Sequence, residues 1–110
     1  CIFCKIVAGK IPATFAYRSD DVVAVTDVSP QAPLHLLVLP RRHARNIAEF
    51  CRAAGDERVA ELMETAARLG TDRCPDGFRL VVNTGNDGGQ TVDHLHVHVL
   101  GGPHMAWPPG

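Results

Sequence analysis

The sequence lacks any apolar run of the ~18 residues that a membrane span requires, because charged residues and prolines interrupt every hydrophobic segment. It also lacks a recognisable signal peptide. The chain begins at Cys1 rather than at methionine, and we expect native residues to precede it. These absences argue against a membrane partner.

Positive charge is not in excess either, because 11 Lys and Arg residues stand against 12 Asp and Glu residues, for a formal net charge of −1. Non-specific binding to a nucleic-acid backbone needs a basic surface. One small basic cluster, formed by Arg41, Arg42 and Arg45, is typical of a solvated face. We therefore expect no nucleic-acid partner.

Cysteine is too scarce for a disulfide-stabilised secreted mini-protein, since the chain has only four cysteines and 45% hydrophobic residues. We expect free thiols and a cytoplasmic location. The 110 residues indicate a single domain over 1–110, of a size at which a partner subunit often adds stability.

Hydrophobic periodicity predicts an α+β fold with five strands and two helices. Short links between most strands favour an antiparallel sheet, and the long helix must cover one of its faces. We expect Gly70 to cap the end of that helix. The predicted elements are a helical turn ending near Gly9, two strands within 14–30 with a turn at 19–21 and the second strand over 22–28, strands at 34–40, 77–83 and 91–102, and a helix at 56–70.

Histidines alternate with apolar residues in the segment HLHVH at 94–98. Side chains two apart on a strand share a face, with neighbours about 6.6–7 Å apart. We predict that His94, His96 and His98 line one face, while the residues at 95, 97 and 99 pack in the core or under the helix. Three imidazoles together form a costly polar environment, which favours catalysis over a satisfied core. A three-histidine zinc site is less favoured, because rings so spaced converge poorly on one tetrahedral ion.

A glycine-rich loop, NTGNDGGQT at 83–91, comes directly before the histidines. Gly85, Gly88 and Gly89 can adopt positive φ and let the backbone approach a ligand. Backbone N–H groups in such loops form concavities that bind anions. Beside three histidines, this loop indicates a phosphate site.

These residues match the histidine-triad signature, and the chain resembles the histidine triad nucleotide-binding (Hint) branch of the histidine triad (HIT) superfamily. The resemblance covers almost the whole chain and is least characteristic in the helix around residues 50–75. It rests on IFCKIVAGKIPA, DVSPQAPLHLLVLPRRH, NTGNDGGQTVDHLHVHVLGG and MAWPPG. It implies the HIT fold and a homodimer whose two sheets join. The implied enzyme is a purine nucleoside phosphoramidase, which cleaves the P–N bond of adenosine or guanosine 5′-monophosphoramidates.

The resemblance also implies roles for three histidines. His96 matches the nucleophile that carries the nucleotidyl group, His98 matches the donor to the phosphate oxygens or leaving group, and His35 matches a supporting histidine. A neutral imidazole is available near pH 7. Its second ring nitrogen must be held as a donor, which a backbone carbonyl on the same strand can do.

The nucleotide site and a metal site are carried over in the same way. Asp27 matches the acceptor of the ribose hydroxyls, although an Asp before Ser-Pro is also typical of a turn. The remaining nucleotide-binding positions are Phe3, Ile6, Val25 and Val28 around the base, Asn83, Gly89, Gln90 and Thr91 at the phosphate, and Trp107, which is expected to reach the partner subunit's site. Structural zinc is implied at Cys1, Cys4, His43 and His94, a set that suits tetrahedral zinc, with buried free thiols as the alternative and no metal required for the chemistry.

Two other functions remain open at the level of sequence. One is a dinucleoside polyphosphate hydrolase from a neighbouring HIT branch, and the other is a non-catalytic nucleotide-binding scaffold. The tail and the DVSPQAP segment favour the phosphoramidase over the first. The intact triad and glycine loop argue against the second.

Overall fold

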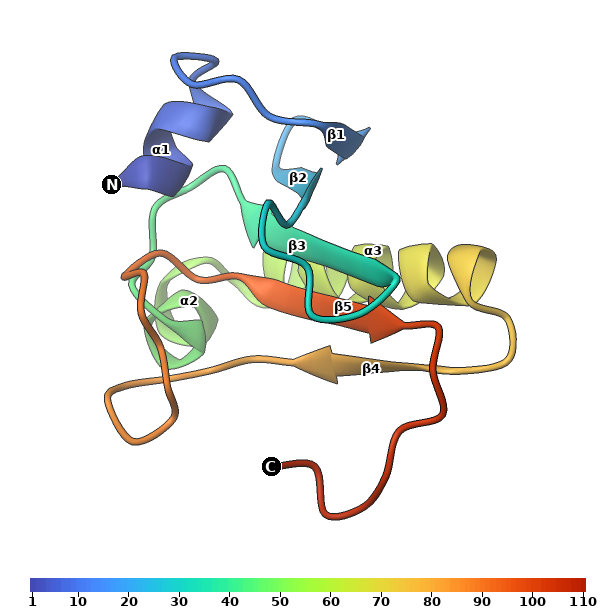
Figure 1. Cartoon of the computed structure of the whole chain (residues 1–110). Coiled ribbons are helices and arrows are strands. Elements are labelled where there is room, and N and C mark those ends of the chain that lie inside the picture. Colours follow the sequence, from blue (N-terminus) through green and yellow to red (C-terminus); the bar gives the residue numbers. More distant parts are fainter.

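Five antiparallel strands form one sheet in the order β1-β2-β3-β5-β4 in the computed structural model, which describes residues 1–110 (Figure 1). The predicted α+β class and antiparallel sheet are confirmed. The strands are β1 (Phe15–Arg18), β2 (Val22–Thr26), β3 (Leu34–Pro40), β4 (Phe78–Val81) and β5 (Val97–Gly101).

Three of the predicted strands are longer than the observed ones. β2 ends at Thr26 because the Asp27 Oδ1 atom accepts a hydrogen bond from the Ser29 N–H at 2.8 Å, which turns the chain. β4 occupies only Phe78–Val81 of the predicted 77–83. β5 begins at Val97 rather than at residue 91, because the Leu95 N–H donates to the Ala44 carbonyl, which lies outside the sheet.

Three helices surround the sheet: α1 (Ile2–Val7), α2 (Ile47–Ala53) and α3 (Asp56–Arg73). The sequence analysis missed α2, although its start carries a recognisable signal. The Asn46 side chain accepts from the Glu49 N–H at 2.9 Å, and Asn followed three residues later by Glu is typical of a helix N-terminus. None of the three helices combines the length and apolar character needed to cross a membrane.

The two faces of the sheet bury different apolar clusters. On one face, Leu62, Ala66 and Leu69 of α3 pack against alternate strand residues, and the cluster includes Leu95, Val97 and Val99. This confirms that the apolar residues between the histidines pack under the long helix. On the opposite face, Phe3 and Ile6 of α1 pack against Val23, Val25, Leu37 and Leu39. Since α1 is short, it covers only part of that face (Figure 1).

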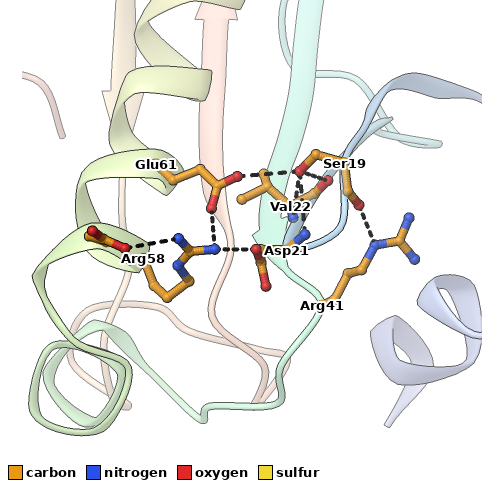
Figure 2. Close-up of polar contacts among 7 residues, drawn as sticks. Ser19, Asp21, Val22, Arg41, Arg58 and Glu61 are labelled. Carbon is orange, nitrogen blue, oxygen red and sulfur yellow. Dashed lines mark hydrogen bonds and ion pairs between the residues drawn. The ribbon is translucent and has the colours of Figure 1, made fainter.

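The turn between β1 and β2 is fastened to α3 by polar contacts (Figure 2). The Ser19 N–H donates to the Val22 carbonyl at 2.8 Å, which closes the turn predicted at 19–21. Arg58 of α3 pairs with Asp21 and lies 3.1 Å from Glu61. These contacts hold the turn between β1 and β2 against the helix.

Gly70 does not cap α3, as the sequence analysis expected, but lies within the helix, which continues to Arg73. A Cβ atom added at Gly70 would lie 2.4 Å from the Phe78 ring of β4. The glycine is therefore required by the close approach of α3 to β4 and not by a turn.

We predict that Gly70→Ala destabilises the protein by about 1–3 kcal/mol, because the clash with Phe78 outweighs the better helix propensity of alanine. Thr71→Ala, at an exposed position of the same helix, is the control and should leave stability unchanged or slightly raised. Urea denaturation of both variants measures the effect. A Gly70→Ala variant as stable as the parent would contradict the packing argument.

Candidate functional site

Four polar side chains converge on the face of the sheet opposite α3. His35 comes from β3, His98 from β5, His96 from the residue before β5, and Asp27 from the residue after β2. His98 pairs across the sheet with Leu37, which belongs to the apolar cluster under α1. The histidines therefore continue the face that α1 leaves partly uncovered.

His96 is held in one tautomer by the backbone. Its Nδ1 atom lies 2.8 Å from the His94 carbonyl oxygen, which can only accept, so Nδ1 carries the proton and donates. The Nε2 atom of a neutral His96 is then left with its lone pair. The side chain is buried at 8% exposure, and its ring centroid lies 5.0 Å from that of His98. His96 thus offers a fixed nitrogen nucleophile.

His98 is oriented by a chain of hydrogen bonds that starts at the backbone. The Gln31 N–H donates to His35 Nδ1 at 3.0 Å, so His35 must carry its proton on Nε2. That N–H donates to His98 Nδ1 at 2.8 Å. A neutral His98 therefore carries its own proton on Nε2 and presents a hydrogen-bond donor beside the His96 ring.

Asp27 lies against this chain, with its Oδ2 atom 3.3 Å from His35 Nε2. Asp27, His35 and His98 offer three donor atoms close enough together to suggest a metal site. However, metal binding needs a lone pair on His35 Nε2, and the Gln31 N–H already occupies the lone pair of Nδ1. A proton on His35 Nε2, donated to His98 Nδ1, gives both ring nitrogens of His35 a hydrogen-bond partner. This arrangement leaves no lone pair on His35 for a metal.

Burial lowers the pKa of His98 from its ordinary value of 6.5, and the neighbouring His96 and His35 lower it further, while Asp27 opposes them. Because the unfolded chain then binds a proton more readily than the folded chain, the contribution of His98 to stability is complete above pH 6.5. It is lost as the pH falls from 6.5 through the lowered pKa of the folded state.

We predict that the free energy of unfolding decreases with acidification below pH 6.5, and that His98→Asn flattens this dependence. One fully buried group contributes a slope of up to about 1.4 kcal/mol per pH unit, and the partial exposure of His98 reduces this value. Urea titrations between pH 5 and pH 8 on both proteins, at constant ionic strength, measure the two slopes. Equal slopes would contradict the assignment.

The expectation that His94 lines one strand face with His96 and His98 is wrong, because β5 begins only at Val97 and the His94 ring points instead into a cluster with Cys1, Cys4 and His43. Its Nε2 atom donates to the Pro40 carbonyl at 2.9 Å, which leaves the Nδ1 lone pair free. His94 Nδ1 lies 3.4 Å from Cys1 Sγ, 3.5 Å from Cys4 Sγ and 3.3 Å from His43 Nδ1. Burial is the main cause of a lowered His94 pKa, which keeps this ring neutral and able to bind a metal.

The four donor atoms fit one tetrahedral ion. With Zn–N about 2.0–2.1 Å and Zn–S about 2.3 Å, a tetrahedron has edges of about 3.3–3.8 Å between its ligand atoms. The distances from His94 lie close to this range, as does the 3.3 Å between Cys4 Sγ and His43 Nδ1. Two thiols with two imidazoles form a set that zinc prefers. The structure therefore brings all four expected ligands together in a cluster that could hold a metal.

The residues expected around the base divide into two groups. Phe3, Ile6 and Val25 are buried in the cluster under α1. Val28 is 96% exposed and, with Asp27, borders an open groove next to Pro12 and Thr14. Val28 is thus free to contact a ligand, but it does not belong to the apolar cluster that contains Phe3, Ile6 and Val25.

The glycine loop has the expected turn, with one difference. Gly85 and Gly89 have φ values of 72° and 76°. Gly88 does not have a positive φ, and is required because a Cβ atom there would lie 2.2 Å from the Thr84 carbonyl oxygen. The Gln90 amide accepts from the Gly85 N–H and donates to the carbonyls of Arg45 and Val92, so this side chain braces the loop. Asn83 and Thr91 flank the loop, half-buried and exposed respectively.

Trp107 lies beside the edge strand β4 within one chain. It is 80% exposed, and its ring stands 5.9 Å from the Arg79 guanidinium, which donates to the Ala106 carbonyl. The structure does not bring Trp107 to the histidines of its own chain.

Two backbone groups that set histidine tautomers, the Gln31 N–H and the Pro40 carbonyl, were not predicted from the sequence. No residue type signals such a role, because every residue but proline has an N–H and every residue has a carbonyl. They become visible only once the neighbouring strands are in place.

Comparison with known proteins places this geometry in a family. The HIT domain model matches residues 8–105. An uncharacterized HIT-like protein of Synechococcus elongatus is 44% identical over 110 residues, which cover 99% of this chain and 96% of the relative. A HIT family hydrolase from Legionella pneumophila superposes with a TM-score of 0.93 at 41% identity, over 100% of this chain and 99% of the other. A histidine triad protein from Clostridium difficile gives a TM-score of 0.85 at 37% identity, over 96% and 93%.

These matches extend over nearly the whole chain and include the segment with the three histidines. The chain therefore belongs to the histidine triad (HIT) family.

Proposed function

We propose that this protein is a hydrolase of the Hint type, a purine nucleoside phosphoramidase that releases AMP or GMP and an amine from nucleoside 5′-monophosphoramidates. The observation that carries the proposal is the tautomer of His96. The His94 carbonyl oxygen lies 2.8 Å from His96 Nδ1 and keeps the proton on that nitrogen. The lone pair of His96 Nε2 is therefore left to act as the nucleophile.

In the first step, His96 Nε2 attacks phosphorus and forms an N–P bond while the P–N bond to the amine breaks. The positive charge that develops on the ring is stabilised by the Nδ1–H bond to the His94 carbonyl. His98 Nε2–H donates a hydrogen bond to the phosphoryl oxygen or the leaving group, and the departing nitrogen takes up a proton from solvent water as it leaves.

In the second step, water attacks phosphorus and releases the nucleotide from His96. The water supplies a hydroxyl group to phosphorus and releases its other proton to solvent, which balances the proton taken up by the amine, so the net reaction consumes one water molecule. His35 keeps His98 in the required tautomer through the 2.8 Å hydrogen bond between Nε2 and Nδ1. Asp27, which follows β2, accepts from the ribose hydroxyls in this proposal.

The base is proposed to rest on the apolar residues of α1 and β2, and the phosphate is proposed to lie against the glycine loop. Support comes from the burial of Phe3, Ile6 and Val25 in one cluster, and from the positive φ of Gly85 and Gly89. With Trp107 lying beside the edge strand β4, a homodimer that joins the two sheets would bring one tail towards the other subunit.

The metal in the Cys1, Cys4, His43 and His94 cluster is proposed to be zinc with a structural role. It joins α1 to the sheet and takes no part in the bond changes. Zinc bound there supplies four strong ligand bonds between segments that are far apart in the sequence.

The test is a substrate panel of adenosine 5′-monophosphoramidate, its guanosine counterpart and a diadenosine polyphosphate, with product release followed by chromatography. We expect release of AMP and GMP from the two phosphoramidates and slow or no cleavage of the polyphosphate. Preferential cleavage of the polyphosphate would overturn the phosphoramidase assignment. Binding of AMP without cleavage of any substrate would favour a scaffold.

A further inference from the structure

The proposed nucleophile, His96, contacts the metal cluster through two residues: the cluster's own His94, and Phe3, whose ring lies against both His94 and His96. We propose that the bound metal positions His96 through these two residues, so that metal binding and nucleotide binding strengthen one another. This inference rests on the proposed nucleotide site but adds a coupling that a purely structural metal does not require.

His94 is the first link, because it makes three different contacts. Its ring nitrogen Nδ1 faces the two thiols and His43, at 3.3–3.5 Å. Its Nε2–H donates to the Pro40 carbonyl at 2.9 Å, and its own backbone carbonyl accepts the Nδ1–H of His96 at 2.8 Å. A shift of the His94 ring therefore moves the group that fixes the tautomer of the nucleophile.

Phe3 is the second link, because it lies between two of the proposed metal ligands in the sequence. Cys1 precedes α1 and Cys4 lies within it. The Phe3 ring stands edge-on to both histidines, with centroid distances of 5.9 Å to His94 and 5.0 Å to His96. Because the six residues of α1 are too few for a helix to be stable alone, α1 depends on its anchors to keep Phe3 in place.

The segment 40–45, which carries His43, connects the metal cluster to the chain around the proposed nucleophile and to the glycine loop. Three of its carbonyls accept hydrogen bonds from the region that leads to the nucleophile. The donors are His94 Nε2 to Pro40, the Leu95 N–H to Ala44 and Gln90 Nε2 to Arg45. Through Gln90, which also holds the Gly85 N–H, the same segment braces the glycine loop proposed to bind phosphate.

Removing the metal should therefore loosen α1 and the 40–45 segment together. The base-binding residues of α1, the His96 ring and the glycine loop would then all become less ordered. Coupling between two binding sites is reciprocal, so a nucleotide that prefers the ordered site must raise the affinity for the metal by the same factor. Couplings of this kind lie between about 5-fold and 150-fold, and we expect a factor of about tenfold here.

The experiment measures the dissociation constant of AMP by calorimetry for the zinc-loaded protein and for the chelator-stripped protein. It also measures the dissociation constant of zinc by competition with a chromophoric chelator, with and without saturating AMP. We expect AMP to bind about tenfold more tightly to the loaded protein, and zinc to bind more tightly by the same factor in the presence of AMP. Nitrogen NMR of the histidine rings should show that His96 loses its single Nδ1–H tautomer when zinc is removed.

Two variants separate positioning from general stability. Phe3→Leu should still bind one zinc ion but lose most of the coupling, with the ratio of the two AMP affinities approaching one. Val7→Ala is the control, because it removes a half-buried aliphatic side chain from the same helix, packed against the same cluster as Phe3. It should leave the ratio of the two AMP affinities unchanged. If the parent unfolds when zinc is removed, the two zinc-loaded variants still test the link through Phe3. Phe3→Leu should disturb the His96 tautomer, and Val7→Ala should leave it unchanged.

The outcomes for the two proposals are distinct. Equal AMP affinities with and without zinc, together with an unchanged His96 tautomer, would overturn the coupling and leave the phosphoramidase proposal intact. No AMP binding by the zinc-loaded parent would instead contradict the nucleotide site itself, and the coupling would fail with it.

Discussion

Replacing His96 by alanine will lower the rate of AMP release from adenosine 5′-monophosphoramidate by about 10⁴-fold or more, as the loss of a covalent nucleophile usually does. No other ring in the site can take its place. His98 Nδ1 accepts from His35, and His94 Nε2 donates to Pro40, so neither has the same free nitrogen in the same position. Steady-state assays of the parent and the variant measure the effect.

The control for His96→Ala is His104→Ala, which removes an exposed histidine from the tail and should keep nearly full activity. Brief reaction of the parent with substrate followed by acid-free denaturation should trap a nucleotidyl group on the protein, and His96→Ala should trap none. A variant that releases AMP at more than about a hundredth of the parent rate would show that His96 is not the nucleophile.

Removing the proposed zinc ion is expected to have the largest effect on stability. We expect the parent to purify with one zinc ion per chain and to lose about 10 °C or more in Tm when a strong chelator removes it, since a ligand at about 100 times its Kd adds ~2.7 kcal/mol. Cys4→Ser should reproduce the loss, because Cys4 Sγ faces both His43 and His94. Metal analysis and thermal unfolding with and without chelator measure both.

Cys51→Ser provides the matched control for the metal site. Cys51 is a free, exposed cysteine of α2 and takes no part in the cluster. This variant should retain one zinc ion and the parent Tm. If the parent binds no zinc at micromolar metal, or if Cys4→Ser and Cys51→Ser behave alike, the cluster is a pair of free thiols near two histidines.

The alternation of histidines with apolar residues was predictive because it rests on geometry that does not depend on the rest of the fold. Side chains two apart share a face, so placing Leu95, Val97 and Val99 in the core leaves the histidine positions to the opposite side. The strand at 34–40 was predicted with its observed bounds, because a continuous apolar run fits a strand covered on both faces.

The ends of the elements were less predictable, because distant groups determine them. The strand at 91–102 starts only at Val97, since the Leu95 N–H finds its acceptor in Ala44 rather than in a neighbouring strand. Gly70 looked like a helix cap from sequence, but the reason for the glycine is the ring of Phe78 on β4. The missed helix α2 is different, because Asn46 and Glu49 carried a local signal for it.

The sequence by itself determined the family resemblance, the α+β class and the residue types of the site. The resemblance also divided the triad, with His94 assigned to the metal set and His96 and His98 to the chemistry, and the tertiary structure decided the direction and tautomer of each ring. His94 turns to Cys1, Cys4 and His43, while His96 and His98 stay together with His35. The physical reason is that a ring's direction and tautomer follow from the partners of its two nitrogens. For His96 the partner is the nearby carbonyl of His94, of the kind expected from the sequence, but the partners of His94 and His35 are backbone groups of Pro40 and Gln31, which chain folding brings into place and which no side-chain pattern encodes.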